Sequence, residues 1–320
     1  MTCSRPHLTS RRRFLTISAA ALGCSGLPAA ASTPVARWRG RAMGAQTGMV
    51  LVGLDDTGAR RAFHAVEREL ARLERIFSLY VTDSQLSQLN ATGILKSPAP
   101  ELLEVLSLSD ALNAASGGAF DPSLQPLWLL RARTAAQGRA ATPGELDAAR
   151  ALVGWDEVRF DAGSVRLAPG MALTLNGVAQ GFVTDRIAAL LRGRGLHDVL
   201  VDMGEIAALG RRADGADWTA GIARPDGRIV NRVALRDRAL ATSAPEGTLL
   251  GANQGHILDP RAPSGAPKHG LVAVSADRAA VADGLSTALC LLSKEEAGQT
   301  LLAFSGARLE TLEQLQEKPT

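Results

Sequence analysis

The sequence predicts an α+β fold with mixed or antiparallel sheets and packed helices. Stretches with the three- and four-residue spacing of amphipathic helices are interspersed with short apolar runs typical of strands. The two kinds do not alternate in the regular order of a βαβ protein. Hydrophobic residues make up 46% of the chain. We expect residues 32–320 to form a single domain, since this length can bury one large core.

The amino-terminal half predicts one strand followed by helices. Residues 43–53 favour a strand, and residues 60–77 carry apolar side chains at helical spacing. Further helices are expected at residues 99–115 and 144–153. The strands expected after them are residues 157–160, 164–167 and 172–175.

The carboxy-terminal half predicts three helices among short strands. The first helix covers residues 180–194 and ends at Gly195, a residue suited to the left-handed end of a helix. Residues 279–292 and 294–304 are the other two helices. The expected strands are residues 197–202, 206–209, 218–222, 232–235, 239–242, 271–275 and 307–311.

The chain begins with the pattern of an exported protein. Arginines at 11–13 precede a short apolar run that closes on alanines at 29–31. This order is typical of a secretory signal, and paired arginines followed by Phe-Leu indicate the twin-arginine route. The run is broken by glycine and proline and is too short to cross a bilayer. We expect residues 1–31 to be a twin-arginine signal peptide of a periplasmic protein, with a lipoprotein anchor at Cys24 as the lesser alternative.

Charge and cysteine content exclude several classes of protein. The formal net charge of +3 becomes −1 without the signal segment, which carries four arginines and no acidic residue. We therefore expect no nucleic-acid partner. Cys290 is then the single cysteine, in an apolar stretch typical of a core residue. The scattered histidines argue against zinc, copper or iron–sulfur sites and favour a hard ion held by oxygen atoms.

Two local patterns could hold phosphate and metal. Residues 174–181 lead through a glycine turn into a helix whose first amides could hold phosphate oxygens, although an ordinary turn has the same pattern. Asp283 and Thr287 are four residues apart on a predicted helix and so share one face. A carboxylate and a hydroxyl at this spacing are acceptable Mg²⁺ ligands; a solvent-facing pair is the alternative.

Two further segments could contact a ligand, and the familiar nucleotide and hydrolase motifs are absent. The glycines of residues 117–122 allow close backbone approach, or simply end a helix. Residues 256–261 place a histidine near an aspartate and an arginine, a pattern of proton transfer, phosphate binding or an ordinary turn. The sequence contains no G-x-S-x-G, Walker-type G-K-[ST] or G-x-G-x-x-G pattern.

Taken in order, these segments resemble the FAD:protein FMN transferase family, also known as the ApbE family. The resemblance covers about residues 40–310. The motifs that carry it are Met43-Gly44, residues 77–80 with 83–90, the S-G-G-A-F-D of residues 116–121, and residues 174–181, 201–205, 241–243, 256–261 and 282–288.

The resemblance implies an α+β fold with FAD bound between two halves. It also implies an enzyme that uses Mg²⁺ and moves FMN from FAD onto a Ser or Thr hydroxyl of an acceptor protein, forming a phosphodiester and releasing AMP. The implied FAD contacts are Met43, Tyr80, Ala119, Phe120, Asp121, Thr174, Gln180 and Ile257. The implied Mg²⁺ positions are Asp283, Thr287 and the carbonyls of Gly177 and Ser286. His256 is the candidate for the base that the acceptor hydroxyl needs, with Asp283 assigned to the metal.

The glycine turn departs from the family pattern. The family's Asp, Gly and Lys are here Thr174, Asn176 and Gln180, so a carboxylate and a positive charge are lost beside an anionic substrate. This N-G-x-A-Q-G form, together with the V-D-M-G-E of residues 201–205, resembles the branch associated with nitrous-oxide reductase maturation, whose acceptor is a membrane-bound electron-transfer protein of nitrous-oxide respiration. The acceptor implied carries a D-x-x-[ST]-[GA]-[AT] motif. An FAD pyrophosphatase that yields FMN and AMP, and a non-catalytic FAD-binding protein, remain alternatives.

Overall fold

A seven-stranded antiparallel sheet forms the centre of the computed structural model, which describes residues 15–17, 33–250, 255–262 and 266–315. Its strands are β2 (Val35–Ala42), β3 (Ala45–Val52), β7 (Val199–Asp202), β8 (Ile206–Leu209), β11 (Arg238–Ser243), β12 (His269–Ala276) and β13 (Arg308–Gln314). Neighbouring strands follow the order β13–β12–β11–β8–β7–β3–β2, and every pair is antiparallel.

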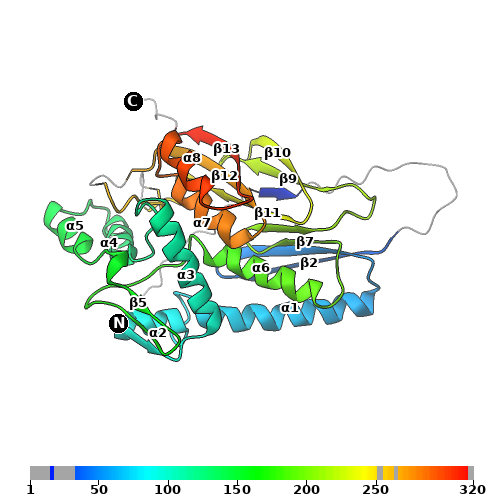
Figure 1. The fold of residues 1–320 in the computed structure, drawn as a ribbon, viewed down its shortest axis with the longest axis horizontal. Coiled ribbons are helices and arrows are strands. Elements are labelled where there is room, and N and C mark those ends of the chain that lie inside the picture. The colour runs from blue at the N-terminus through cyan, green and yellow to red at the C-terminus, as the bar shows by residue number, and fades with distance from the viewer. Residues whose placement is uncertain (1–14, 18–32, 251–254, 263–265, 316–320) are drawn as a thin grey trace.

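Helices cover one face of this sheet, as Figure 1 shows for α1 (Asp56–Phe77), α6 (Ala179–Arg192) and α7 (Ala279–Leu289). The alternation of side chains along the strands divides the core in two. Leu51 and Val201 are buried in the cluster on the helix side. Their neighbours Val50 and Leu200 are buried in a second cluster on the opposite face. The sheet is therefore apolar on both faces.

A smaller sheet covers the opposite face. It contains β1 (Leu15–Ile17), β9 (Trp218–Ala223) and β10 (Ile229–Leu235), in the order β1–β9–β10. Trp218 and Ile222 of β9 lie in the same buried cluster as Val50. Strand β1 falls within the expected signal peptide; the remainder of residues 1–31 lies outside the described residues.

The remaining elements surround one end of the helical layer. They are α2 (Gln85–Thr92), β4 (Ile94–Lys96), α3 (Pro100–Ala115), α4 (Gln125–Ala136), α5 (Pro143–Arg150), the 3₁₀ turns Trp155–Glu157 and Pro245–Gly247, β5 (Arg159–Phe160), β6 (Ser164–Arg166) and α8 (Lys294–Leu302). Strands β4, β6 and β5 form a third small sheet. Within the part of the chain that the structure describes, no helix is long and apolar enough to cross a membrane.

Several helices begin where the sequence provides a cap. Asp55 accepts a hydrogen bond from the Gly58 amide at the start of α1 (2.7 Å). Helices α5 and α8 begin with reciprocal capping boxes, in which a Thr or Ser is paired with a Glu three residues later. These local bonds explain why the predicted helix starts fall close to the observed ones.

The α+β prediction is confirmed, but the strand predicted at residues 172–175 is wrong. Only an isolated bridge joins Ala172 to Leu124. The Asn90 side chain instead binds the Leu173 backbone on both sides: its Nδ2 donates to the carbonyl (2.8 Å), and its Oδ1 accepts from the amide (2.7 Å). A side-chain amide thus occupies the place that a neighbouring strand would take.

Candidate active site

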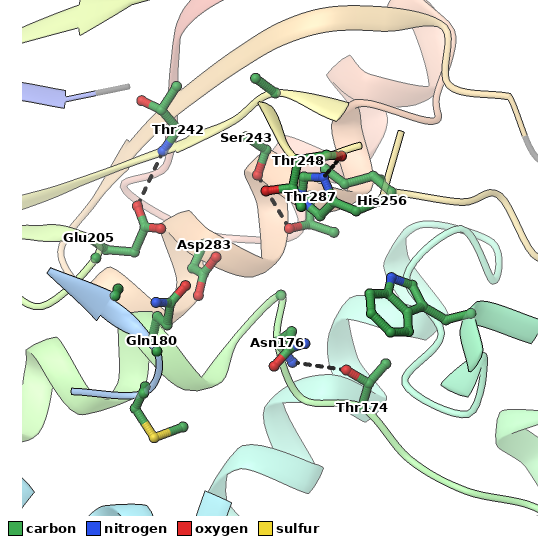
Figure 2. A pocket seen from close by; sticks show the side chains of 18 of the residues that line it. Thr174, Asn176, Gln180, Glu205, Thr242, Ser243, Thr248, His256, Asp283 and Thr287 are labelled. Carbon is green, nitrogen blue, oxygen red and sulfur yellow. Dashed lines mark hydrogen bonds between the residues drawn. The ribbon is translucent and has the colours of Figure 1, made fainter. Parts of the chain in front are cut away.

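A pocket of about 430 Å³ opens where the central sheet, the α3–α4 turn and α7 meet. Figure 2 shows polar side chains from these distant segments converging on it. It contains every residue expected at the site except Ser286, namely Met43, Tyr80, Ala119, Phe120, Asp121, Thr174, Gly177, Gln180, His256, Ile257, Asp283 and Thr287. The structure therefore brings the sequence motifs together, while the role of each residue remains a prediction.

The β2–β3 hairpin presents Met43 at one wall of the pocket. Met43 and Gly44 form its two-residue turn, with φ of 51° and 76°. Such turns need positive φ at both positions, a conformation that costs free energy for a side chain other than glycine. The Met43 amide donates to Glu74 Oε1 of α1 (2.9 Å), which holds the turn in place. The structure thus fixes a flexible apolar side chain at the pocket.

The turn after α3 presents Phe120 to the same pocket. Gly117 and Gly118 end the helix with φ of 57° and 80°. The Phe120 amide donates to Ser116 Oγ (3.0 Å), and its carbonyl accepts from Asn113 Nδ2 (2.9 Å). The S-G-G-A-F segment is therefore both a helix end and part of the pocket wall.

Asp121 is the charged residue of this turn. Its Oδ1 accepts from the Ser123 amide (2.7 Å) and hydroxyl (2.6 Å). Burial raises the pKa of Asp121, and the bonds from Ser123 oppose that rise. Because Ser123 already occupies this oxygen, Asp121 is held in one orientation.

The glycine turn before α6 lies directly against α7. A Cβ added at Gly177 would meet Thr287 Oγ1 at 3.1 Å and Phe120 Cε2 at 3.2 Å, so only glycine allows this approach without displacement. Asp283 Oδ2 accepts from the Gly181 amide (3.0 Å). Two motifs that are more than a hundred residues apart thus form one side of the pocket.

Hydrogen bonds within the protein reduce the number of amides that this turn could offer to phosphate. The amides of Val178 and Ala179 both donate to the Leu175 carbonyl (3.0 and 2.8 Å), and the Gly181 amide donates to Asp283. These three amides are therefore engaged within the protein.

Gln180, the residue expected at the family's lysine position, lines the pocket. It is 6% exposed and lies beside Asp202 and Glu205, which are also buried and line the pocket. A Cβ at Gly204 would meet Gln180 Nε2 at 2.7 Å, and Gly204 has φ of 113°. The V-D-M-G-E segment carried the family resemblance, but its two acids were not among the expected site residues.

A chain of hydroxyls links Thr287 to β11. Ser243 Oγ lies 2.8 Å from Ser286 Oγ and 3.3 Å from Thr287 Oγ1. Ser286 is fully buried, and its carbonyl accepts from Cys290 Sγ (3.3 Å). The prediction that Cys290 is a core residue is confirmed, since it is fully buried and burial raises the pKa of its thiol.

His256 is oriented by backbone carbonyls. Its Nδ1 lies 3.0 Å from the Pro245 carbonyl and 3.2 Å from the Thr248 carbonyl. Because both partners accept hydrogen bonds, Nδ1 carries the proton, and in the neutral imidazole Nε2 then carries the lone pair. This tautomer suits a residue that takes up a proton.

Asp259 and Arg261, the other polar residues of this segment, have a structural role. The guanidinium donates to both carboxylate oxygens of Asp259 (2.9 and 2.8 Å) and to the carbonyls of Ser116 and Leu291 (3.4 and 3.3 Å). They join the ends of α3 and α7, so His256 is the candidate for proton transfer here.

The rim of the pocket carries Tyr80, the only tyrosine of the chain. It is 65% exposed, an unusual position for a large aromatic side chain. A ring at this place could pack against an aromatic ligand that fills the pocket.

Comparison with known proteins agrees with this arrangement. The sequence model of the ApbE family matches residues 43–310. A relative from Treponema pallidum named FAD:protein FMN transferase is 32% identical, covering 74% of this chain and 73% of its own length. One of the same name from Klebsiella pneumoniae is 27% identical, covering 87% and 85%.

Solved structures show the same fold. The flavin transferase ApbE from Vibrio cholerae matches with a TM-score of 0.73 at 25% identity, covering 84% of this chain and 90% of that one. The apo flavinyl transferase ApbE from Pseudomonas stutzeri matches with a TM-score of 0.73 at 28% identity, covering 85% and 87%. The fold and pocket therefore define a flavin-transferase class. The chain belongs to the ApbE family.

Proposed function

We propose that this protein transfers FMN from FAD to a Ser or Thr hydroxyl of an acceptor protein. The observation that carries the proposal is the pocket itself, which joins Asp283 and Thr287 of α7 to the oriented His256. The curated relatives named FAD:protein FMN transferase support the same activity.

The donor set fits Mg²⁺. Asp283 and Thr287 both line the pocket, and the Gly177 turn packs against Thr287. These are hard oxygen donors, with Asp283 only 4% exposed. No group of three or more His, Cys, Asp or Glu that could hold a metal exists among the described residues, so the cation would depend on one carboxylate, a hydroxyl and carbonyls such as those of Gly177 and Ser286. When bound, Mg²⁺ would neutralise charge on the phosphoryl oxygens.

The chain's own residues orient the reactants. Met43, Phe120 and Tyr80 provide apolar and aromatic surface for flavin or adenine rings. In the transfer, the acceptor oxygen forms a bond to the phosphorus of the FMN half and the bond from that phosphorus to AMP breaks. His256 Nε2 takes up the hydroxyl proton, and AMP leaves.

One assay separates the proposal from its alternatives. The protein is mixed with FAD, Mg²⁺ and an acceptor carrying the D-x-x-[ST]-[GA]-[AT] motif. Covalently yellow acceptor together with AMP supports the transferase. AMP with free FMN indicates a pyrophosphatase, and bound FAD without AMP indicates a non-catalytic binding protein.

Replacing His256 with alanine should slow FMN transfer by about a hundredfold or more, the usual contribution of a positioned base. The measurement is the initial rate of AMP release with acceptor present. His64→Ala is the matched control, because the His64 side chain is 71% exposed on α1. A His256→Ala rate equal to that of the control would contradict the assignment.

We propose the periplasm as the site of action, and the support for it is in the sequence alone. The arginine pair and apolar run support export by the twin-arginine route, so we place the enzyme in the periplasm with a periplasmic acceptor. The form of the glycine turn supports a membrane-bound electron-transfer acceptor of nitrous-oxide respiration. Covalent flavin on such a protein, present in wild-type cells and missing after deletion of this enzyme, is the result expected.

A further inference from the structure

Helices α6 and α7, green and orange in Figure 1, pack against each other. A Cβ added at Gly181 of α6 would lie 2.3 Å from the Ala279 carbonyl oxygen and 2.7 Å from Ala280 Cα. Both obstacles are backbone atoms of α7. The two helix starts therefore touch through main chain.

Each helix supplies a carboxylate to the first turn of the other. Asp185 of α6 accepts from the Ala279 amide at Oδ1 (2.7 Å) and from the Ala280 amide at Oδ2 (3.0 Å). Asp283 of α7 accepts from the Gly181 amide at Oδ2 (3.0 Å). Neither helix has a side-chain cap from its own N-cap residue. The capping is thus reciprocal, and each carboxylate also meets the positive end of a helix dipole.

Asp185 itself lies outside the active-site pocket. It lines a separate, smaller pocket, where Glu104 of α3 and Arg278, the N-cap of α7, face it. Arg278 Nε is 3.9 Å from Asp185 Oδ2, and the Asp185 side chain is 20% exposed. Burial raises the pKa of Asp185 to about 6, against the opposing effect of the two amide bonds. The protein thus holds a partly buried carboxylate outside the active-site pocket.

We infer that Asp185 is a positioning residue for the metal-binding face of α7. Asp283 and Thr287 follow the Asp185-bound turn on the same helix, about one and two turns later. Fixing that first turn sets the direction of the helix axis and so the place of both oxygen donors. The inference rests on the proposed function, since it assigns Asp185 a task in preparing the Mg²⁺ site.

The test is Asp185→Asn in the full chain. The asparagine side chain has the same shape as aspartate and keeps one oxygen acceptor. It lacks the negative charge, and its NH₂ group faces one of the two α7 amides, which then loses its acceptor. We expect the dissociation constant for Mg²⁺, measured by calorimetry with FAD bound, to rise about tenfold, as for groups that orient metal ligands. FAD affinity without Mg²⁺ should be unchanged, and excess Mg²⁺ should restore AMP release. A purely structural defect would lower the folded fraction measured before Mg²⁺ is added, whereas a positioning defect would leave that fraction unchanged.

Asp55→Asn is the matched control, because Asp55 caps α1 away from the pocket and its loss should leave Mg²⁺ affinity unchanged. Asp185→Glu keeps the charge and should weaken Mg²⁺ less than Asp185→Asn; it replaces that variant if asparagine prevents folding. Wild-type Mg²⁺ affinity in an Asp185 variant would overturn the positioning role of Asp185 but not the proposed Mg²⁺ site. A wild-type protein that binds no Mg²⁺ would overturn the metal site as well.

Discussion

Replacing Asp283 with alanine should reduce AMP release from FAD at least about a thousandfold, which corresponds to roughly 4 kcal/mol of lost transition-state stabilisation. Asp283 is the only carboxylate in the proposed ligand set, and it projects from α7 into the pocket. Without it, the charge that holds the cation is absent, and the Gly181 amide loses its acceptor. The measurement is AMP by chromatography, with Mg²⁺ binding followed in parallel.

Asp283→Asn distinguishes the effect of the lost charge on activity from any effect on folding. Asparagine can still accept from the Gly181 amide, so this variant should melt close to wild type while losing the same activity. Asp110→Asn is the control. Asp110 lies on α3, where its side chain accepts a hydrogen bond from Trp155 Nε1 (2.8 Å), and it does not line the pocket. Turnover within tenfold of wild type in Asp283→Asn would remove Asp283 from the metal site.

Local patterns predicted the parts of the site that depend on one element. Asp283 and Thr287 share a face because α7 is helical, and the spacing alone gives this result. The motif glycines likewise mark real turns, since Gly117 and Gly118 have positive φ. Such features depend on neighbours within a few residues, which the sequence displays directly.

The missed parts depend on partners far along the chain. The Asp185 carboxylate binds amides 94 and 95 residues away, and Asn90 binds a backbone 83 residues away. Nothing in the residues around Asp185 indicates that its partner is a helix start. Sequence spacing could therefore predict that Asp283 and Thr287 share one face of α7. It could not predict that Asp185 binds the first turn of this helix.

The missed helix α4 has a local explanation. Its apolar residues run consecutively over 127–130 and lack helical spacing, and Leu129 is 50% exposed between the buried Leu130 and the half-buried Trp128. Trp128 and the N-cap residue Leu124 line the pocket, whereas Leu129 is not among the lining residues. The run of adjacent apolar residues thus lacks the amphipathic spacing from which a helix is predicted.

Gly181→Ala should have the largest effect on the fold near the site. The added methyl group would meet α7 backbone at 2.3 Å, and backbone cannot rotate away as a side chain can. We expect a loss of about 2–3 kcal/mol in the free energy of unfolding, because overpacking moves one helix off the other. The shift would also carry Asp283 away from the Gly181 amide, so AMP release should fall with it.

Gly298→Ala provides the matched control for this prediction. Gly298 lies within α8, and a Cβ there meets nothing within 4 Å. The same substitution should stabilise the protein by about 0.5–1 kcal/mol, because alanine loses less backbone entropy in a helix than glycine. Denaturant unfolding of both variants measures whether each substitution lowers or raises the free energy of unfolding. If Gly181→Ala were also stabilising and fully active, α6 and α7 could not be in main-chain contact, and the reciprocal capping by Asp185 and Asp283 would lose its basis.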